Sequence, residues 1–253
     1  MSQGRLRGRT ALVTGAGRRI GRAIALALAQ AGVNVAVHYS SSGSEAGQFV
    51  EEVKRHGVQA WAVHADFNQS AETETLIART LKETHSLDFL VNSAAIFLPG
   101  TLRDLDFAGL MEHMRVNAWT PLLLSRDFAR LAGTGKIVNL LDARIAAGDS
   151  AHVGYLLSKQ ALAGLTRMMA LEFAPRITVN GIAPGPILPP PGKGEGYLRQ
   201  VAETVPLQRH GEPADIAAAA LYLLESDFVT GQILYVDGGQ HLKEPPGGSN
   251  PDS

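Results

Sequence analysis

The chain has 253 residues, of which 45% are hydrophobic and 19% charged, so it has enough apolar side chains for a large core and is neither disordered nor collagen-like. Its 23 Lys and Arg residues against 24 Asp and Glu residues give a net charge of −1, which argues against nucleic acid or an anionic membrane as partner and favours a small molecule. The absence of cysteine excludes disulfides, thiolate nucleophiles and Cys-based metal sites.

The beginning of the chain bears on where the protein works. Residues 1–9 form a short basic arm that leads straight into an apolar, strand-like run, without the apolar core and cleavage site of a signal peptide. No apolar run reaches the length of about 18 residues that a membrane-spanning helix needs. We therefore expect a cytoplasmic protein with no membrane partner.

Short runs of β-branched and apolar residues alternate with helix-length segments along the chain. The runs predict strands at residues 10–14, 33–38, 59–64, 89–92, 136–141, 177–182 and 232–236. The segments between them predict helices at residues 19–31, 44–56, 71–85, 102–131, 153–174 and 213–225. Continuous apolar strands alternating with helices indicate an α/β fold, a single Rossmann-type doubly wound parallel sheet of about seven strands with helices on both faces.

This pattern predicts one domain over residues 1–242, with two segments that depart from it. Residues 184–196 are rich in proline and glycine and are expected to form no regular helix or strand, which makes them the start of a substrate lid around residues 186–204. The tail at residues 243–253 has no apolar residues to bury and is expected to be flexible.

A glycine-rich turn joins the first predicted strand to the first predicted helix. Gly15 permits a tight turn and Gly21 permits close packing of helix on strand, with Arg18, Arg19 and Ile20 between them. The unpaired N–H groups at the helix start favour a pyrophosphate. The turn therefore predicts a dinucleotide site, and a plain tight turn is the alternative.

The end of the second predicted strand indicates which dinucleotide is bound. NAD-binding proteins usually carry an acidic residue there, whereas this chain has His38, Tyr39, Ser40 and Ser41 and no acid before Glu45. Hydroxyl groups and a histidine can donate to a 2′-phosphate, and Arg18 and Arg19 can supply positive charge, so NADPH is the expected cofactor. The serines can instead cap the next helix.

Three further residues carry polar side chains at the expected cofactor and catalytic edge. Asp66, after the third strand, can accept a hydrogen bond from an adenine amino group or cap the following helix. Tyr155 and Lys159 are four residues apart and share one face of a predicted helix. A cation beside a phenol is expected to lower the tyrosine pKa, which prepares the phenol for proton exchange near neutral pH.

The chain resembles the short-chain dehydrogenase/reductase family from Gly8 to Leu242, through the glycine turn, Tyr155 and Lys159, together with Asn92-Ser93-Ala94, Asn117, Asn180…Pro184-Gly185 and Asp237-Gly238-Gly239. The resemblance implies that Tyr155 donates a proton, that Lys159 holds the nicotinamide ribose, and that Asn117 supports a proton relay. It also implies cofactor contacts at Ala65, Asp66, Phe67, Asn92, Ser93, Ala94, Pro184, Gly185 and Ile187.

Three positions depart from the common family pattern. Arg19 stands where a glycine is usual, Asp142 stands where a serine usually precedes the tyrosine, and Phe97 follows an altered Asn92-Ser93-Ala94-Ala95 segment. Each has an ordinary explanation, as a solvated helix residue, a strand-end cap and a core aromatic. Together they resemble the pteridine reductase and dihydromonapterin reductase branch, although the basic residue usual there after Tyr39 is missing.

This resemblance implies hydride transfer from NADPH to a pteridine, with Tyr155 and Asp142 relaying protons. Phe97 is expected to stack on the pterin ring and Arg19 to donate to the pterin carbonyl or to a cofactor phosphate, while Leu188 is a candidate for the pocket wall.

Two other functions remain open: a reductase of 3-oxoacyl thioesters or other ketones, and a dinucleotide-binding sensor without catalysis. His152 either approaches the active site or is simply solvated. The histidines show no paired metal-ligand spacing, so no metal is expected. Resemblance alone implies a homotetramer.

Overall fold

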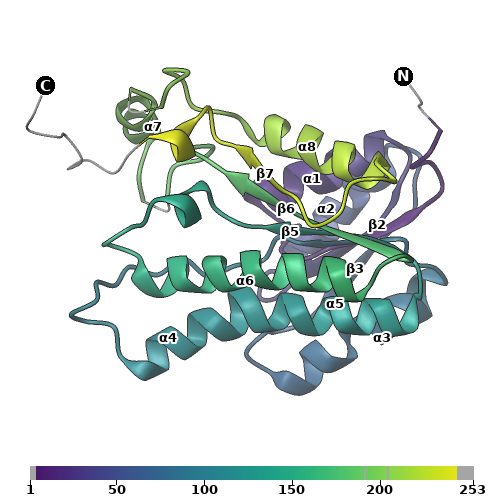
Figure 1. Ribbon diagram of the computed structural model, residues 1–253. Coiled ribbons are helices and arrows are strands. Elements are labelled where there is room, and N and C mark those ends of the chain that lie inside the picture. Colours follow the sequence, from purple (N-terminus) through teal and green to yellow (C-terminus); the bar gives the residue numbers. More distant parts are fainter. Residues whose placement is uncertain (1–3, 191, 204, 244–253) are drawn as a thin grey trace, which may run out of the picture.

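The sheet is the framework of the molecule, and Figure 1 shows it between two layers of helices in a computed structural model that describes residues 4–190, 192–203 and 205–243. All strand pairs are parallel, in the order β3-β2-β1-β4-β5-β6-β7. The strands are β1 (Thr10–Val13), β2 (Asn34–Tyr39), β3 (Ala60–His64), β4 (Phe89–Asn92), β5 (Gly135–Leu140), β6 (Ile177–Pro184) and β7 (Ile233–Val236). The prediction of a doubly wound α/β fold is confirmed.

Each face of the sheet has its own helical layer and its own apolar core. One core packs α1 (Arg19–Gln30), α2 (Gly43–Lys54) and α8 (Pro213–Glu225) on the sheet. The other packs α3 (Ser70–Thr84), α5 (Thr120–Leu131) and α6 (Val153–Glu172) on the opposite face, as Figure 1 shows. Strands covered on both faces need apolar side chains on both sides, which explains their continuous apolar sequence.

The helix predicted at residues 102–131 is wrong in its bounds and in its continuity. The first helix there, α4 (Phe107–Met114), begins later, because the Asp106 side chain accepts a hydrogen bond from the Gly109 N–H at 2.8 Å and caps it. One π-helical turn, η1 (Arg115–Trp119), then separates α4 from α5. Such turns often occur at functional sites.

The segment after β6 also differs from the prediction. Strand β6 continues to Pro184, and a short helix, α7 (Glu195–Ala202), begins where irregular chain was expected. Two short 3₁₀ helices, η2 (Ala143–Ala146) and η3 (Gln240–Leu242), had no sequence signal that identified them. Pro191 of the expected lid and most of the expected flexible tail, residues 244–253, lie outside the described residues.

The strand order places a ligand crevice at a defined edge. The chain passes from β3 at one edge back to β4, which pairs with β1, so the winding reverses between β1 and β4. In open parallel sheets ligands bind outside the carboxyl ends of the strands at such a reversal. Within the three described stretches, no helix is long and apolar enough to cross a bilayer.

Candidate active site

A cavity of about 940 Å³ lies at the carboxyl ends of the strands. Most residues predicted to bind cofactor or substrate line it: Gly15, Arg18, Arg19, Ile20, Gly21, His38, Tyr39, Ser40, Ser41, Asp66, Phe67, Ser93, Ala94, Phe97, Asp142, Tyr155, Lys159, Pro184, Gly185, Ile187 and Leu188. Three predicted residues, Ala65, Asn92 and Asn117, are almost fully buried behind its wall. The structure thus brings nearly all of the predicted site together.

The glycine turn between β1 and α1 has the backbone geometry that a pyrophosphate site requires. Gly15 has a φ of 63°, in the left-handed region that favours glycine. A Cβ on Gly21 would collide with the Gly15 carbonyl oxygen, so α1 packs closely on the turn. Both glycines and the start of α1 face the cavity, where the helix offers unpaired N–H groups to an anion. The turn therefore fits a dinucleotide.

The buried ring of His38 binds the backbone of this turn. Its Nδ1 accepts a hydrogen bond from the Gly15 N–H at 3.0 Å, and its Nε2 lies 3.0 Å from the carbonyl oxygen of Ala65. The ring is stacked on Phe67 with centroids 4.4 Å apart. Burial lowers the pKa of His38 to about 4, so the ring is neutral at pH 7. The prediction that His38 donates to a cofactor phosphate is wrong, because both ring nitrogens already bind backbone groups.

The buried neutral ring of His38 makes stability depend on pH. Its pKa is lower in the folded chain than the ordinary 6.5, so the unfolded chain binds more protons between about pH 6.5 and 4. Stability is therefore lost as the pH falls through that window, by about 3 kcal/mol in all. We expect the Tm of the wild type to fall more steeply below about pH 6.5 than the Tm of His38→Asn. His56→Asn, at an exposed histidine, is the control, and equal slopes for wild type and His38→Asn would contradict this assignment.

Two predicted helix caps are absent. Asp66 accepts a hydrogen bond from the Asn68 N–H at 2.9 Å, while the N-cap position of α3 belongs to Gln69. Ser42 occupies the N-cap position of α2 but makes no side-chain capping bond. Asp66, Ser40 and Ser41 line the cavity, so their contacts with a cofactor stay predictions.

Asn92 has a structural role that differs from the predicted one. Its Nδ2 donates to the Oδ1 of Asn139 at 2.8 Å, which ties the end of β4 to β5, and the residue is 2% exposed. A direct cofactor contact from this buried side chain is therefore wrong. The cavity wall beside it is shaped by Thr14, whose Oγ1 accepts hydrogen bonds from the Ser93 and Ala94 N–H groups at 2.9 and 3.0 Å.

Tyr155 on α6 stands at the inner end of the cavity and donates a hydrogen bond from its hydroxyl to Oδ2 of Asp142 at 3.0 Å. Burial, and then the negative charge of Asp142, raise the pKa of Tyr155 well above its ordinary value. The sequence predicted the opposite direction. That prediction considered only the charge of Lys159. It did not foresee that the Tyr155 ring is buried or that the Asp142 carboxylate points toward its hydroxyl.

Lys159 lies beneath Tyr155, one helical turn along α6. Its Nζ is 5.8 Å from the centroid of the tyrosine ring and donates to the carbonyl oxygen of Leu140 at 2.6 Å. Burial lowers the pKa of Lys159 to about 8. The lysine thus connects the floor of the cavity to the end of β5.

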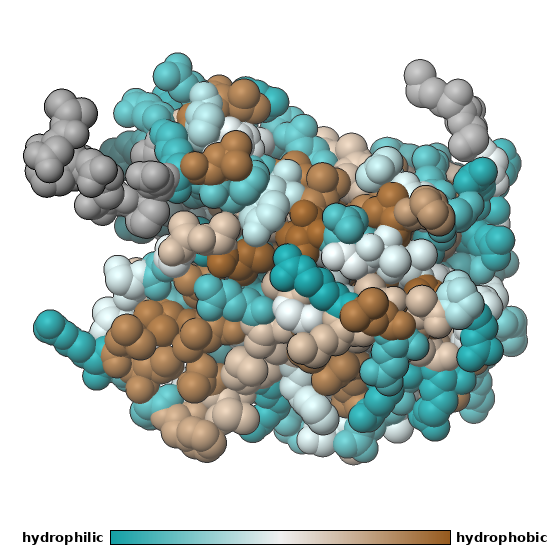
Figure 2. Space-filling view, in the orientation of Figure 1, coloured by the Kyte–Doolittle hydropathy of each residue, from teal (hydrophilic) through white to brown (hydrophobic). Residues whose placement is uncertain are grey.

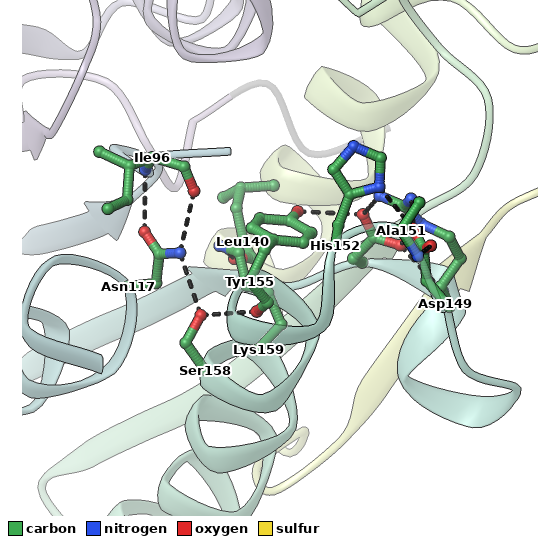
Figure 3. Close-up of polar contacts among 11 residues, drawn as sticks. Ile96, Asn117, Leu140, Asp149, Ala151, His152, Tyr155, Ser158 and Lys159 are labelled. Atoms are coloured by element: carbon green, nitrogen blue, oxygen red, sulfur yellow. Dashed lines mark hydrogen bonds and ion pairs between the residues drawn. The ribbon is translucent and has the colours of Figure 1, made fainter. Parts of the chain in front are cut away.

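Asn117 lies in the π-helical turn, and Figure 3 shows it between Ile96 and Ser158. Its Oδ1 accepts from the Ile96 N–H at 2.9 Å, and its Nδ2 lies 3.0 Å from both the Ile96 carbonyl oxygen and the Ser158 hydroxyl. Ser158 donates in turn to the carbonyl oxygen of Tyr155 at 2.6 Å. Asn117 therefore fixes the Ile96 backbone, which lines the cavity, against the first turns of α6.

Sequence reasoning missed Arg144 and Asp149, which follow Asp142, whereas it named His152 as a residue that either approaches the active site or is solvated. Arg144 forms ion pairs with Asp142 and with Asp149, and His152 lies 3.0 Å from Asp149 through Nδ1. Arg144 and His152 line the cavity, and Figure 3 shows His152 above Asp149. The available signal was the density of charged residues between β5 and Tyr155, within one short stretch.

Phe97, Arg19 and Leu188, three of the predicted substrate residues, also line the cavity. The Phe97 ring stacks on His152 with centroids 4.1 Å apart and meets Tyr155 edge-on at 4.7 Å. Arg19 has a positive φ of 54°, and its Nη2 donates to the carbonyl oxygen of Pro189 at 2.9 Å. Arg19 therefore joins the glycine turn to the segment expected to be a lid, where Leu188 faces the cavity.

This sheet order, with a glycine turn after β1 and a Tyr–Lys pair on one helix beside the same cavity, defines an oxidoreductase of the Rossmann type. Comparison with known families identifies which one. The family model described as "Enoyl-(Acyl carrier protein) reductase" matches residues 15–241, and the chain belongs to this short-chain dehydrogenase/reductase family.

Individual relatives point to two activities. The 3-oxoacyl-[acyl-carrier-protein] reductase FabG of Staphylococcus epidermidis is 34% identical over 250 residues, covering 92% of this chain and 99% of that protein. Two solved structures of FolM alternative dihydrofolate reductase 1 in complex with NADP are 35% identical. The protein from Brucella suis has a TM-score of 0.89 and covers 94% of this chain and 98% of its own, and that from Brucella canis has a TM-score of 0.88 with 96% and 98% covered.

Proposed function

We propose that this chain is an NADPH-dependent reductase of a pteridine, such as a dihydropteridine or dihydrofolate. The observation that carries the proposal is the carboxylate of Asp142, which lies 3.0 Å from the hydroxyl of Tyr155 inside the cavity. At neutral pH a carboxylate accepts hydrogen bonds and does not donate them. Such a carboxylate would repel the oxygen of a ketone, but it would accept a hydrogen bond from an N–H or amino group of a pteridine.

NADPH is the cofactor that the cavity fits. Gly15, Gly21 and the start of α1 would hold its pyrophosphate, while the hydroxyls of Ser40 and Ser41 and the cation of Arg18 would face its 2′-phosphate. The end of β2 has no acidic side chain that would repel this phosphate. The FolM structures in complex with NADP support the same choice. When bound, the cofactor supplies a hydride to carbon in a C=N bond of the substrate.

Tyr155 supplies the proton that balances this hydride. Its raised pKa keeps the hydroxyl protonated at neutral pH, so it can donate to the ring nitrogen as the C=N bond becomes a C–N single bond. The phenolate that remains is stabilised by the nearby Lys159 ammonium and regains a proton from solvent. In the overall reaction, one C=N bond of the pteridine takes up a hydride and a proton, and one NADPH is oxidised to NADP⁺.

Phe97, Arg19 and Leu188 would favour a substrate with a flat ring. Phe97 lies beside Tyr155 with its ring packed on His152, which gives the cavity an aromatic wall. Arg19 donates to the carbonyl oxygen of Pro189 and lines the cavity, so it would hold residues 186–190 beside the substrate. Leu188, Tyr197 and Leu198 line the same side.

A substrate panel tests the proposal. NADPH oxidation by the purified protein is measured with a dihydropteridine, a dihydrofolate and an acetoacetyl thioester, and each assay is repeated with NADH. We expect turnover of the pteridine or the folate, and a higher kcat/KM with NADPH than with NADH. Turnover of the thioester alone would disprove the pteridine proposal and favour a 3-oxoacyl thioester reductase, the activity named for FabG. Cofactor binding without any turnover would favour a sensor.

Two further properties belong to the proposal. We propose a homotetramer in the cytoplasm, as the family resemblance implies. Large apolar side chains gather on the surface over α4, where Phe107 is 78% and Met111 is 41% exposed (Figure 2), which fits a contact between subunits. Exposed apolar patches of this kind mark contact surfaces. The part of the chain that the structure describes contains no group of three His, Asp or Glu side chains able to hold a metal, and the proposed chemistry uses none.

A further inference from the structure

Arg144 bridges the two carboxylates beside the proposed catalytic tyrosine. Its Nε donates to Oδ1 of Asp142 at 2.9 Å and its Nη2 to Oδ2 at 2.8 Å, so the contact with Asp142 is bidentate. Its Nη1 donates to Oδ2 of Asp149. A single guanidinium therefore binds both oxygens of the carboxylate that accepts from Tyr155.

Packing and further hydrogen bonds fix the Arg144 guanidinium in this place. Its Cζ lies 5.2 Å from the centroid of Phe97 and 5.7 Å from that of Tyr155. Asp149 accepts from the Ala151 N–H at 2.7 Å, which holds the far carboxylate in turn. The Arg144 side chain is 29% exposed and both carboxylates are 14% exposed, so solvent screens the cluster only in part.

Asp142 and Arg144 act on Tyr155 in opposite directions. The charge of Asp142 raises the tyrosine pKa, and the charge of Arg144 lowers it. Among the residues that the structure describes, the other titratable groups beside this cluster are Lys159 beneath the ring and Asp149 with His152 behind Arg144. A carboxylate without a counterion would oppose formation of the phenolate that Tyr155 becomes when it donates its proton.

We propose that Arg144 is a positioning residue that lets Asp142 stand beside Tyr155. It orients the carboxylate toward the cavity and offsets its charge, so that Asp142 and Arg144 together act as one unit where a neutral serine is usual in the family. This inference rests on the proposed function, because it assigns Tyr155 the role of proton donor.

The test compares Arg144→Leu, Arg144→Lys, Asp142→Ser and the double variant Asp142→Ser/Arg144→Leu with the wild type. We expect Arg144→Leu to lower kcat by about 10²-fold, as for loss of an efficient general acid, with KM changed much less. The alkaline limb of kcat/KM should move to higher pH, because the tyrosine pKa rises without the cation. Arg144→Lys should recover part of kcat, since it restores charge without the bidentate contact.

The double variant gives the sharpest outcome. If Arg144 serves mainly to offset the charge of Asp142, the fold-loss of kcat in the double variant should be much smaller than the product of the fold-losses in the two single variants. Additive losses, an unchanged kcat in Arg144→Leu, or an effect confined to KM would overturn the inference, the last because it would indicate direct substrate binding.

Two controls separate the proposed role of Arg144 from a general effect of removing an arginine and from the choice of substrate. Arg22 pairs with Glu52 and lies 4.9 Å over the ring of Phe49, so Arg22→Leu removes a similar arginine outside the cavity and should leave kcat and the pH profile unchanged. All variants are also assayed with the acetoacetyl thioester. If only the thioester is reduced, the pteridine proposal fails, while the coupling between Asp142 and Arg144 is still measured.

Discussion

Replacement of Tyr155 by phenylalanine is expected to lower kcat for pteridine reduction by about 10³-fold, the midpoint of what a positioned general acid contributes. The hydroxyl donates to Oδ2 of Asp142 at 3.0 Å beside the cavity, and its raised pKa keeps the proton available at neutral pH. The Kd for NADPH, measured by fluorescence titration, should change little, since the substitution leaves the glycine turn intact.

Tyr222→Phe is the matched control for this experiment. Tyr222 is 55% exposed on α8 and is not among the residues that line the cavity, so its hydroxyl has no part in the proposed chemistry. Retention of more than about a tenth of wild-type kcat by Tyr155→Phe would contradict the assignment of the tyrosine as proton donor, because even weak general acids contribute more than this.

The glycine turn should show a large effect on cofactor binding. In Gly21→Ala the new Cβ meets the Gly15 carbonyl oxygen, which is backbone and cannot move without opening the turn between β1 and α1. We expect the Kd for NADPH to rise about tenfold or more, equivalent to about 1.4 kcal/mol of lost binding. The Tm should also fall by several degrees, as for overpacking of a tight contact.

Gly17→Ala is the control in the same turn. A Cβ on Gly17 would meet no protein atom within 4 Å, so this variant should unfold as the wild type does; because Gly17 lines the cavity, it controls for stability and not for cofactor affinity. Equal cofactor affinity in Gly21→Ala and the wild type would show that the close approach of helix and turn is not needed for binding.

The glycine turn and the Tyr155–Lys159 pair could be predicted because local spacing determines both. A helix places side chains four residues apart on one face, and a strand followed by glycines and a helix allows few backbone paths. The positions of the strands could also be predicted, because strands of a parallel sheet are buried on both faces and therefore appear as continuous apolar runs.

Other features depend on contacts between distant segments, which spacing does not determine. The direction of the Tyr155 pKa depends on burial and on where Asp142 points, and the role of His38 depends on the backbone groups of Gly15 and Ala65. Arg144 was missed for a different reason: its two carboxylates are close in the sequence, but no helix or strand spacing predicts the turn through η2 that brings them to the guanidinium.

The ionic cluster also has a consequence for how this protein could have diverged from its relatives. Asp142, Arg144, Asp149 and His152 all lie in residues 142–152, between β5 and α6, and Phe97 and Tyr155 contact them from outside this interval. Changes in this one interval leave the sheet, the glycine turn and the Tyr155–Lys159 pair in place. A new substrate preference can therefore arise by exchange of a single connecting segment on an unchanged scaffold.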